Sequence, residues 1–415
     1  MNKHVIFIPH YKGSFKALLH IALYIKENND VNPHFVLYFD DDSEAKRTLQ
    51  DHGIGFSIYR NRLFTRIPLI GSAAKLVADL VYSVRLINRL SPVQAMVCAV
   101  ETHELEYALI SVLNRRNINT IVMQWAQTVP KEYYQSVDSK IRKITAFSKV
   151  KDRLKNIIKR ITEKILGVKY AQSYGDGDAK YFAVMGSYYK EMFFKQGVSE
   201  TKLVVTGHPE FDCLYDLSLN IKDQSFKQTI LEKFGLDNAK PIWILAREAI
   251  VYFKLVPEEK DKQDISDVLE ILSKYHPQVQ IILKLHPRDS KEYYEFVREK
   301  FPHVIIIHEC DLYSLIAVCD LYISQISNTM MWAIALDKPV ISYDFNHQPH
   351  WDYFRDKEGV IKADSSEELV GIIKSVQEKG LSPENYQNCQ IAREKYMTFD
   401  GKACQRISDL FFSKI

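Results

Sequence analysis

Short apolar runs alternate with longer amphipathic stretches along almost the whole chain. Each run has the length and the β-branched or aromatic content of a buried strand, and each stretch has the hydrophobic spacing of a helix. Strands that alternate with helices in this way are typical of a parallel sheet with right-handed crossovers. The predicted strands cover residues 4–10, 34–40, 55–60, 94–100, 120–128, 180–186 and 202–207 in a first series and 241–247, 278–287, 303–309, 320–324 and 338–344 in a second.

The two series of strands predict two domains of the doubly wound α/β class. A chain of 415 residues is also too long for a single hydrophobic core. Between the series lies a polar stretch without strand signals, which we interpret as a connection between the domains. The predicted organisation is a Rossmann-like domain over 1–216, a connection over 217–240, a second Rossmann-like domain over 241–390 and a C-terminal helix over 391–415 that can cross back to the first domain.

The composition is that of a globular protein without a strong charge bias. Hydrophobic residues make up 46% and charged residues 26%, and the formal net charge is only +3, so nothing global indicates a nucleic-acid partner. The six cysteines form neither a CxxC pair nor a zinc spacing, which is typical of reduced thiols in a cytosolic protein. No apolar run has the length of a membrane span, and the first residues lack the apolar core of a signal peptide. We therefore expect a cytoplasmic protein.

One segment, 140–170, departs from this charge balance. It carries eleven Lys or Arg residues against two acidic ones, with Ile and Leu at helical spacing. A basic amphipathic helix of this kind can lie on an anionic membrane surface, which would place the protein peripherally on the inner face of the cytoplasmic membrane. The alternative is a solvated outer helix whose apolar stripe packs on the sheet. The sequence leaves both interpretations open.

Polar residues gather where the predicted strands end, which in an open parallel sheet is the edge at which ligands bind. The clearest cases are two loops of the second series, KLHPRD and ISQISNT. A further polar pair, RE, ends the first strand of that series, and GH ends the last strand of the first series. The residues at these strand ends are Gly207, His208, Arg247, Glu248, Lys284, His286, Pro287, Arg288, Ser324, Ser327, Asn328 and Thr329.

Three stretches of the sequence resemble motifs of GT-B glycosyltransferases. The segment AVMGSYYKEMFFKQGVSETKLVVTGHPEFD (183–212) is similar to the crossover segment that these enzymes share with UDP-N-acetylglucosamine 2-epimerases. KLHPRD resembles the HP motif of bacterial sialyltransferases, Kdo transferases and CDP-glycerol transferases, and ISQISNT resembles the paired-serine motif that follows it. The resemblance implies a capsule or surface-polysaccharide enzyme whose two Rossmann-like domains face a central cleft. It further implies that the first domain binds the acceptor and the second binds a nucleotide-linked donor, without a metal.

Under this resemblance, the strand-end residues hold the donor. His286 can aim an imidazole N–H at a phosphate oxygen, with Lys284 or Arg288 adding positive charge. The polar residues of ISQISNT offer hydroxyls, an amide and backbone N–H groups at a helix start. The RE pair offers a further cation, and the GH pair lets a ligand come close. Two plainer interpretations remain, namely an ordinary helix cap for SNT and a surface ion pair for Arg247.

Transfer to a hydroxyl acceptor also needs a base, normally a carboxylate or a histidine of the first domain. Glu101, directly after a strand, is the favoured candidate, followed by His10, His103 and Glu104. The acidic loop YGDGD is another candidate, although its two glycines favour a simple turn. No DxD motif or histidine-rich cluster indicates a metal, so the sequence predicts neither a metal nor a cofactor.

The run WAIALDKPV departs from the family pattern at one position. UDP-sugar enzymes of this group carry a ribose-binding Glu where this chain has Trp332. We therefore expect a cytidine donor, in the first place a CMP-activated acidic sugar such as Kdo or a sialic-acid-like sugar, and a glycan or lipid-linked glycan acceptor. The alternatives are a CDP-glycerol-type glycerophosphotransferase, a UDP-sugar glycosyltransferase or 2-epimerase-like enzyme, and a degenerate nucleotide-binding scaffold.

Overall fold

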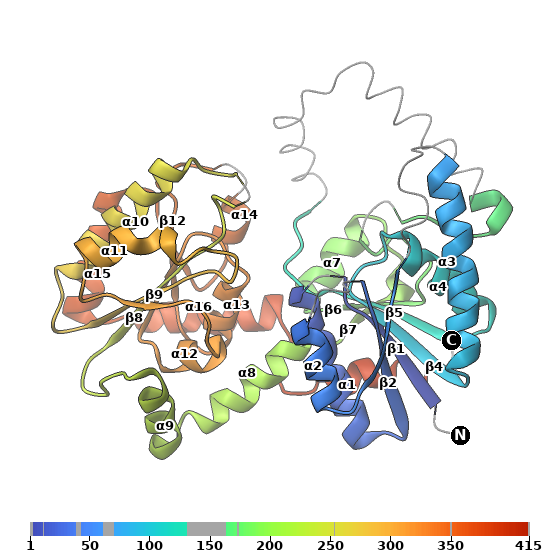
Figure 1. Cartoon of the computed structure of the whole chain (residues 1–415). Helices are drawn as coiled ribbons and strands as arrows, with labels where there is room; N and C mark the ends of the chain where they lie inside the picture. Colours follow the sequence, from blue (N-terminus) through green and yellow to red (C-terminus); the bar gives the residue numbers. More distant parts are fainter. Residues whose placement is uncertain are drawn as a thin grey trace. The chain divides into compact units, whose positions relative to one another are not determined.

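Two parallel sheets organise the chain, one in each of two structural units (Figure 1). Unit 1 comprises Met1–Asp212 and Tyr396–Ile415, and unit 2 comprises Cys213–Lys395. The computed structural model describes residues 3–10, 12–38, 43–60, 70–130, 163–171, 174–252, 254–348 and 351–413.

Seven parallel strands form the sheet of unit 1. They are β1 (Lys3–Ile8), β2 (Val31–Leu37), β3 (Gly55–Ile58), β4 (Val93–Cys98), β5 (Asn119–Met123), β6 (Tyr181–Val184) and β7 (Leu203–Val205). Their order across the sheet is β3-β2-β1-β4-β5-β6-β7, so the winding of the chain reverses between β1 and β4. The loops that follow two such strands diverge, and ligands of open α/β sheets bind at this switch point.

Helices cover both faces of the unit 1 sheet (Figure 1). They are α1 (Lys12–Asn28), α2 (Ser43–Asp51), α3 (Ile70–Arg89), α4 (Glu104–Arg115), α7 (Ser187–Lys195), the 3-10 turn η1 (Glu200–Lys202) and α17 (Ala403–Asp409). On one face, the alternate residues Val5 and Phe7 of β1 share a core with Leu18 of α1 and Ile407 of α17. Helices α3 and α4 lie together on the other face. Burial on both faces explains why these strands read as continuous apolar runs.

The segment after unit 2 returns to complete unit 1. Helix α17 lies beside α1, and its residues Cys404 and Ile407 belong to the same buried core. The backbone N–H groups of Ala403 and Cys404 donate to the two carboxylate oxygens of Asp212, at 2.9 and 2.8 Å. Asp212 therefore caps the N-terminus of α17 and ties the returning segment to the end of the first part of unit 1.

Gly207, which the sequence predicted to admit a ligand, admits this returning segment instead. Its φ is +83°, and a Cβ there would lie 2.9 Å from the carbonyl oxygen of Thr398 and 3.1 Å from the Cβ of Ala403.

Gly207→Ala is expected to lower the free energy of unfolding by about 2–4 kcal/mol, through backbone strain and this clash. Gly197 is a matched control, because its φ is +91° and no atom lies within 4 Å, so Gly197→Ala should lose only about 1–2 kcal/mol. Denaturant unfolding compares the two variants, and equal losses would contradict the packing argument.

Six parallel strands form the sheet of unit 2. They are β8 (Ile242–Ala246), β9 (Gln280–Lys284), β10 (Ile305–Ile307), β11 (Leu321–Ser324), β12 (Val340–Tyr343) and β13 (Val360–Ala363). Their order is β10-β9-β8-β11-β12-β13, which puts the switch point of this sheet between β8 and β11. The sequence did not predict β13, because three of its four residues are only partly buried or exposed and the apolar signal is correspondingly weak.

The helices of unit 2 include two that the sequence treated as a connection. The predicted connection 217–240 holds the end of α8 and all of α9, and it belongs to unit 2. Helices α10 and α15 pack beside each other against the core of the sheet, as part of the second large apolar cluster. The helices are α8 (Pro209–Asn220), α9 (Gln224–Phe234), α10 (Glu258–Ser273), the 3-10 turn η2 (Glu292–Tyr294), α11 (Glu295–Lys300), α12 (Leu312–Val318), α13 (Thr329–Ala335), α14 (Asp352–Arg355), α15 (Ser366–Lys379) and α16 (Pro383–Tyr396).

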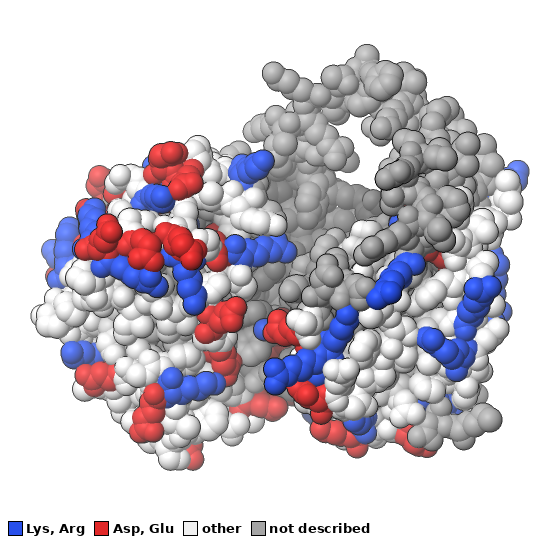
Figure 2. All heavy atoms as spheres, in the orientation of Figure 1, with Lys and Arg blue, Asp and Glu red and all other residues white. Residues whose placement is uncertain are grey.

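Most of the predicted basic helix, 140–162, lies outside the described residues. Over the described surface, Figure 2 shows basic and acidic side chains interspersed on the face in view, in keeping with the small net charge. All six cysteines are described and none forms a disulfide. Within the described ranges, no helix combines the length and the apolar character needed to cross a bilayer.

Candidate functional site

The switch point of unit 2 brings together the polar residues that follow β8 and β11. Ser324, the last residue of β11, donates a hydrogen bond from its hydroxyl to Oε1 of Glu248. The backbone N–H of Gln325 donates to the same oxygen at 3.2 Å. Both Ser324 and Gln325 are completely buried. The two strand ends are therefore joined through one carboxyl group, and Ser324 is committed to it rather than to a ligand.

Arg247 is a buried structural hub, which corrects its predicted role as a phosphate or carboxylate ligand. Its NH1 donates to Oε1 of Gln325 at 3.1 Å and to the hydroxyl of Tyr343 at 2.8 Å, and its NH2 contacts Oδ1 of Asp261 at 2.5 Å. The residue as a whole is 4% exposed. The plainer alternative of a surface ion pair is also wrong, because both charged partners are inside unit 2.

Glu248 faces the inside of a cavity next to this hub. Burial raises the pKa of its carboxyl group to about 7, against the lowering effect of Arg247 and of two hydrogen bonds. Its second oxygen, Oε2, is buried and has no hydrogen-bond partner among the described residues. A buried polar atom without a partner is costly, so it marks a place where a ligand group can add a hydrogen bond.

The cavity has a volume of about 260 Å³ and lies at the carboxyl ends of β8 and β9. The guanidinium of Arg288 stands over the ring of Tyr252, 5.5 Å from its centroid. Hydrogen bonds orient two further rings, from Tyr293 to Asp261 at 2.9 Å and from Tyr294 to Asp289 at 2.8 Å. The lining thus combines aromatic rings, carboxyl groups and one cation, from Glu248, Val251, Tyr252, Asp261, Arg288, Asp289, Ser290, Tyr293 and Tyr294.

The loop after β9 fixes the orientation of His286. The backbone N–H of Arg288 donates to Nδ1 of His286 at 3.1 Å, so Nε2 carries the ring hydrogen and is the available donor. Asp289 accepts from the backbone N–H of His286 at 3.0 Å and closes the turn around Pro287. Burial lowers the pKa of His286, which keeps the ring neutral near pH 7. The loop therefore holds one imidazole N–H in a fixed direction, beside the Arg288 end of the cavity.

Lys284 does not share in this arrangement, contrary to the prediction. Its ammonium group donates to the carbonyl oxygens of Leu285 and His308, at 2.6 and 2.8 Å. The residue is 5% exposed. Lys284 therefore holds the ends of β9 and β10 together, and the positive charge near His286 comes from Arg288.

The serine loop after β11 is largely occupied with its own hydrogen bonds. Oγ of Ser327 accepts from the backbone N–H of Thr329 at 3.3 Å and from its hydroxyl at 2.8 Å, and the Tyr322 hydroxyl lies 2.6 Å from the same Thr329 oxygen. Ser327 and Thr329 thus form a local turn at the start of α13, whose N-cap residue Asn328 makes no side-chain cap hydrogen bond. Asn328 between them is exposed.

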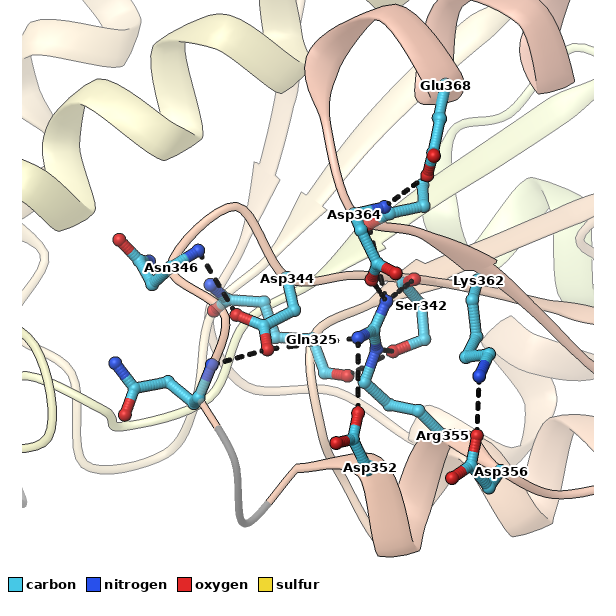
Figure 3. A network of polar contacts seen from close by, with 12 residues as sticks. Gln325, Ser342, Asp344, Asn346, Asp352, Arg355, Asp356, Lys362, Asp364 and Glu368 are labelled. Atoms are coloured by element: carbon cyan, nitrogen blue, oxygen red, sulfur yellow. Dashed lines mark hydrogen bonds and ion pairs between the residues drawn. The ribbon is translucent and has the colours of Figure 1, made fainter.

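The buried residue Arg355 holds the start of the same loop, at Gln325, through Ser342 (Figure 3). Nε of Arg355 donates to Oγ of Ser342 at 3.1 Å, and Ser342 in turn donates to the carbonyl oxygen of Gln325 at 2.5 Å. The NH2 of Arg355 reaches Asp364 at 2.5 Å. The series of hydrogen bonds from Arg355 through Ser342 to Gln325 joins the ends of β11 and β12. The contact of Arg355 with Asp364 adds the end of β13, so this edge of the sheet is rigid.

The raised pKa of Glu248 predicts a pH-dependent contribution to stability. The folded state holds this proton more tightly than the unfolded chain, so the contribution is fully present below about pH 4.5 and falls as the pH rises to about 7. Glu248→Gln, which resembles the protonated side chain, removes this dependence. The unfolding free energy of the wild type relative to the variant should drop by about 3 kcal/mol between pH 4.5 and 8. Denaturant unfolding across this range tests it, and a constant difference would contradict it.

The switch point of unit 1 gathers two of the predicted catalytic residues with one that was not predicted. His10 follows β1, and His103 is the N-cap of α4 after β4. Their rings stack with centroids 3.6 Å apart. Nδ1 of His10 lies 3.4 Å from Oε1 of Glu106, which is completely buried in α4, and the hydroxyl of Tyr38 donates to the other oxygen of Glu106. Together these side chains form a polar cluster at the carboxyl edge of the sheet.

Glu101 is not part of this cluster, and its assignment as the base is corrected. The residue is completely buried, and its Oε1 accepts from the backbone N–H of Gly177 at 3.0 Å and from Lys202 at 3.4 Å. Lys202 also donates to the carbonyls of Gly175 and Gly177, at 2.8 and 2.9 Å. Glu101 and Lys202 therefore fasten the YGDGD loop to the sheet, in keeping with the interpretation of that loop as a turn.

His208 is also buried inside unit 1 rather than placed to hold a donor. Its side chain is 1% exposed, and the backbone N–H of Glu210 donates to its Nδ1 at 3.3 Å. Burial lowers its pKa to about 3, so the ring stays neutral at physiological pH. His208 stabilises the turn before α8.

Glu106 and Asp289 are two of the site residues that the sequence did not predict, and there is a physical reason for each. Glu106 lies in the first turn of a predicted helix and Asp289 sits among charged loop residues, so neither position looked distinctive. The signal for Glu106 was its spacing, because His103 and Glu106 stand three residues apart and share one face at the start of α4. The signal for Asp289 was its place three residues after His286, where an Asp can close the turn.

Solved structures with the same architecture cover nearly the whole chain. UDP-GlcNAc 2-epimerase from Neisseria meningitidis, bound to UDP-GlcNAc, superposes with a TM-score of 0.64 at 12% identity, covering 99% of both chains. The epimerase from Methanocaldococcus jannaschii in complex with UDP-GlcNAc and UDP gives 0.59 at 16% identity, again over 99% of both chains. The wall teichoic acid polymerase TagF gives 0.61 at 15% identity, over 99% of this chain and 88% of the other. These similarities establish the GT-B fold that the sequence predicted.

The sequence itself identifies the family. No curated protein matches the chain. Residues 169–413, more than half of the chain, match the family model described as CDP-Glycerol:Poly(glycerophosphate) glycerophosphotransferase. This match spans the turn that holds His286, the cavity beside it and the returning helix α17. The protein is therefore a GT-B transferase of surface-polymer biosynthesis that belongs to the CDP-glycerol:poly(glycerophosphate) glycerophosphotransferase family.

Proposed function

We propose that the protein transfers glycerol phosphate from a CDP-glycerol-type donor to a hydroxyl group of a surface polymer. The observation that carries this proposal is the neutral, oriented His286 in the loop whose residues Arg288 and Asp289 line the cavity, within a chain of the glycerophosphotransferase family. The acceptor oxygen would form a bond to the phosphorus that carries glycerol, the P–O–P bridge would break, and CMP would leave. The Nε2–H group of His286 would donate to the phosphate oxygen on which negative charge grows.

The lining of the cavity favours a neutral polyol over the acidic sugar that the sequence first suggested. Three carboxyl residues, Glu248, Asp261 and Asp289, line it together with Arg288 as the single cation. Glycerol hydroxyls can donate to carboxyl oxygens such as Oε2 of Glu248, whereas the carboxylate of Kdo or a sialic acid would find Arg288 as its only cationic partner among the described lining residues. The volume of about 260 Å³ suits a small group of this kind.

The cytidine part of the donor rests on Trp332. Its ring packs edge-on against Tyr313, with centroids 4.8 Å apart, where UDP-sugar enzymes of the group carry their ribose-binding Glu. This residue supports a cytidine rather than a uridine nucleotide, and it also weighs against a UDP-GlcNAc 2-epimerase activity despite the similarity of fold.

Unit 1 would provide the acceptor side. In the part of the chain that the structure describes, His10 and His103 are the predicted bases that lie at the carboxyl edge of this sheet, with Glu106 beneath them. We propose that this cluster takes the proton from the acceptor hydroxyl. The acceptor is a glycan or lipid-linked glycan phosphate polymer, and the basic segment 140–170 would hold the enzyme at an anionic membrane surface where such polymers grow.

A panel of donors tests the proposal by thermal stabilisation, because a ligand of the folded state raises the melting temperature by mass action. CDP-glycerol and CDP are expected to stabilise the protein, and UDP-GlcNAc and CMP-activated acidic sugars are not. Mass spectrometry of a polymer acceptor incubated with CDP-glycerol should then show increments of one glycerol phosphate. If a CMP-sugar raised the melting temperature and no CDP compound did, the assignment of a CDP-linked donor would be wrong.

A further inference from the structure

We infer that Glu106 is the positioning residue that makes His10, rather than His103, the base for the acceptor hydroxyl. Glu106 holds Nδ1 of His10 as the nitrogen that carries the ring hydrogen, which leaves Nε2 as the nitrogen that accepts a proton. As the acceptor oxygen bonds to phosphorus, its proton passes to Nε2, and the carboxylate behind the ring stabilises the imidazolium. This role rests on the proposed transfer to a hydroxyl, whereas the tautomer of His10 is a property of unit 1 alone.

Three contacts fix the ring of His10. Its Nδ1 is buried and lies 3.4 Å from Oε1 of Glu106, although the side chain as a whole is 15% exposed, so the exposed part of the ring lies elsewhere. The ring of His103 stacks on it with centroids 3.6 Å apart, and the ring of Tyr38 meets it edge-on at 4.8 Å. A flip of the ring would have to separate these contacts, so the two nitrogens have separate roles.

Glu106 can act only on the Nδ1 side of this ring. The residue is completely buried, the Tyr38 hydroxyl donates to its Oε2, and no described residue donates a hydrogen bond to its Oε1. Burial, and then the neighbouring carboxylate, raises the pKa of Tyr38, so this hydroxyl keeps its hydrogen and remains a donor. A buried carboxylate needs a donor or a cation at its second oxygen as well, and Nδ1–H of His10 provides it. Contacts of 3.4 Å between catalytic groups tighten when the substrate complex forms.

Only one of the two stacked rings carries the charge. Burial, more than the neighbouring ring, lowers the pKa of His103, which keeps that ring neutral near pH 7. The carboxylate faces the other ring, so the imidazolium is favoured there. The titratable and charged groups around the two rings, among the described residues, are Tyr38 after β2, Glu106 on α4, and Glu104 with Lys75, which form an ion pair at 3.3 Å.

The first experiment measures the tautomer by nitrogen-15 NMR of the full-length protein labelled at histidine. The wild type should carry the ring hydrogen of His10 on Nδ1, with the signals assigned by their loss in His10→Gln. In Glu106→Gln the Tyr38 hydroxyl still needs an oxygen, so the amide nitrogen faces His10 and donates to Nδ1. The ring hydrogen should then move to Nε2. Hydrogen on Nε2 in the wild type would overturn the inference, whatever the donor is and whether or not the variant folds.

The second experiment measures kcat with CDP-glycerol and a polymer acceptor. Glu106→Gln should lower kcat about 10²- to 10⁴-fold, the range of a general base that is lost or held in the wrong tautomer. Adding Tyr38→Phe should restore part of this loss, because the amide can then turn its oxygen toward Nδ1–H of His10. A packing role predicts the opposite, since the second change removes a further buried group, and a double variant less active than Glu106→Gln would contradict the positioning role. If the wild type transfers nothing from CDP-glycerol, the donor proposal fails and the tautomer still decides the inference.

Glu104→Gln is the matched control, since Glu104 belongs to the same helix turn but pairs with Lys75. It should keep the hydrogen of His10 on Nδ1 and lose far less kcat than Glu106→Gln. The acid limb of the kcat/KM profile should move to lower pH in Glu106→Gln, because the imidazolium has lost its carboxylate, and should move much less in Glu104→Gln. Equal shifts in the two variants would mean that Glu106 acts only through its charge and does not orient the ring.

Discussion

His286→Asn is expected to lower kcat for glycerol-phosphate transfer by about 10²- to 10³-fold, the usual loss when one fixed hydrogen-bond donor to a developing charge is removed. The Oδ1 atom of Asn can still accept from the backbone N–H of Arg288, as Nδ1 of His286 does at 3.1 Å. The turn should therefore stay intact, and the melting temperature should not change. Steady-state kinetics on a polymer acceptor and a thermal unfolding curve provide the two measurements.

His286→Gln is the matched variant for the same position. Its side-chain amide can bring a donor close to where Nε2 stands, but it gives up the acceptor that closes the turn. We expect it to keep more activity than His286→Asn and to be slightly less stable. The reverse order, with Asn active and Gln inactive, would mean that His286 acts by shaping the turn and not by donating to the donor phosphate.

Arg247→Met should lower the free energy of unfolding of unit 2 by about 3–5 kcal/mol, because it leaves the carboxylate of Asp261 buried without its cation. Both side chains of this pair are at most 2% exposed, and the same guanidinium also serves Gln325 and Tyr343. Denaturant unfolding followed by tryptophan fluorescence suits the measurement, since Trp243, Trp332 and Trp351 all belong to unit 2.

An exposed ion pair of the same unit provides the control. Arg298 and Glu295 are each about half exposed, so Arg298→Ala should change stability by less than about 1 kcal/mol. If Arg247 held a substrate phosphate instead, its replacement would raise KM and leave stability unchanged. If Arg247→Met had the wild-type free energy of unfolding and a raised KM, the structural role of Arg247 would be refuted.

The fold was predictable because both faces of each sheet are buried, so that most strands consist of consecutive apolar residues. All strands except β13 were found in this way, and β13 was missed because Val360, Ile361 and Lys362 are not fully buried. The connection was misjudged for a related reason. Helix α9 buries few residues and ends at Gly235 in a left-handed cap, so its polar sequence looked like a linker.

The site was predictable only as far as strand ends allow. A strand end fixes which edge a residue reaches, and it correctly placed His286, His10 and His103. It does not fix where a long charged side chain points, because that depends on partners distant in sequence. Glu101 turns inward to Lys202, which lies 101 residues away, and Arg247 turns inward to Asp261 on the following helix. A charged residue at the carboxyl edge of the sheet therefore did not always have a side chain exposed to a ligand.

The return of α17 to unit 1 has a consequence for biosynthesis. Cys404, Ile407 and Phe411 fill the core that Val5 and Phe7 begin, and Asp212 holds the helix in place. A nascent chain can thus close unit 2, which is continuous in sequence, while the earlier-made unit 1 still exposes an apolar groove along α1. The half of the protein that is synthesised first is the half that finishes folding last, and until then it is the part that a chaperone would recognise.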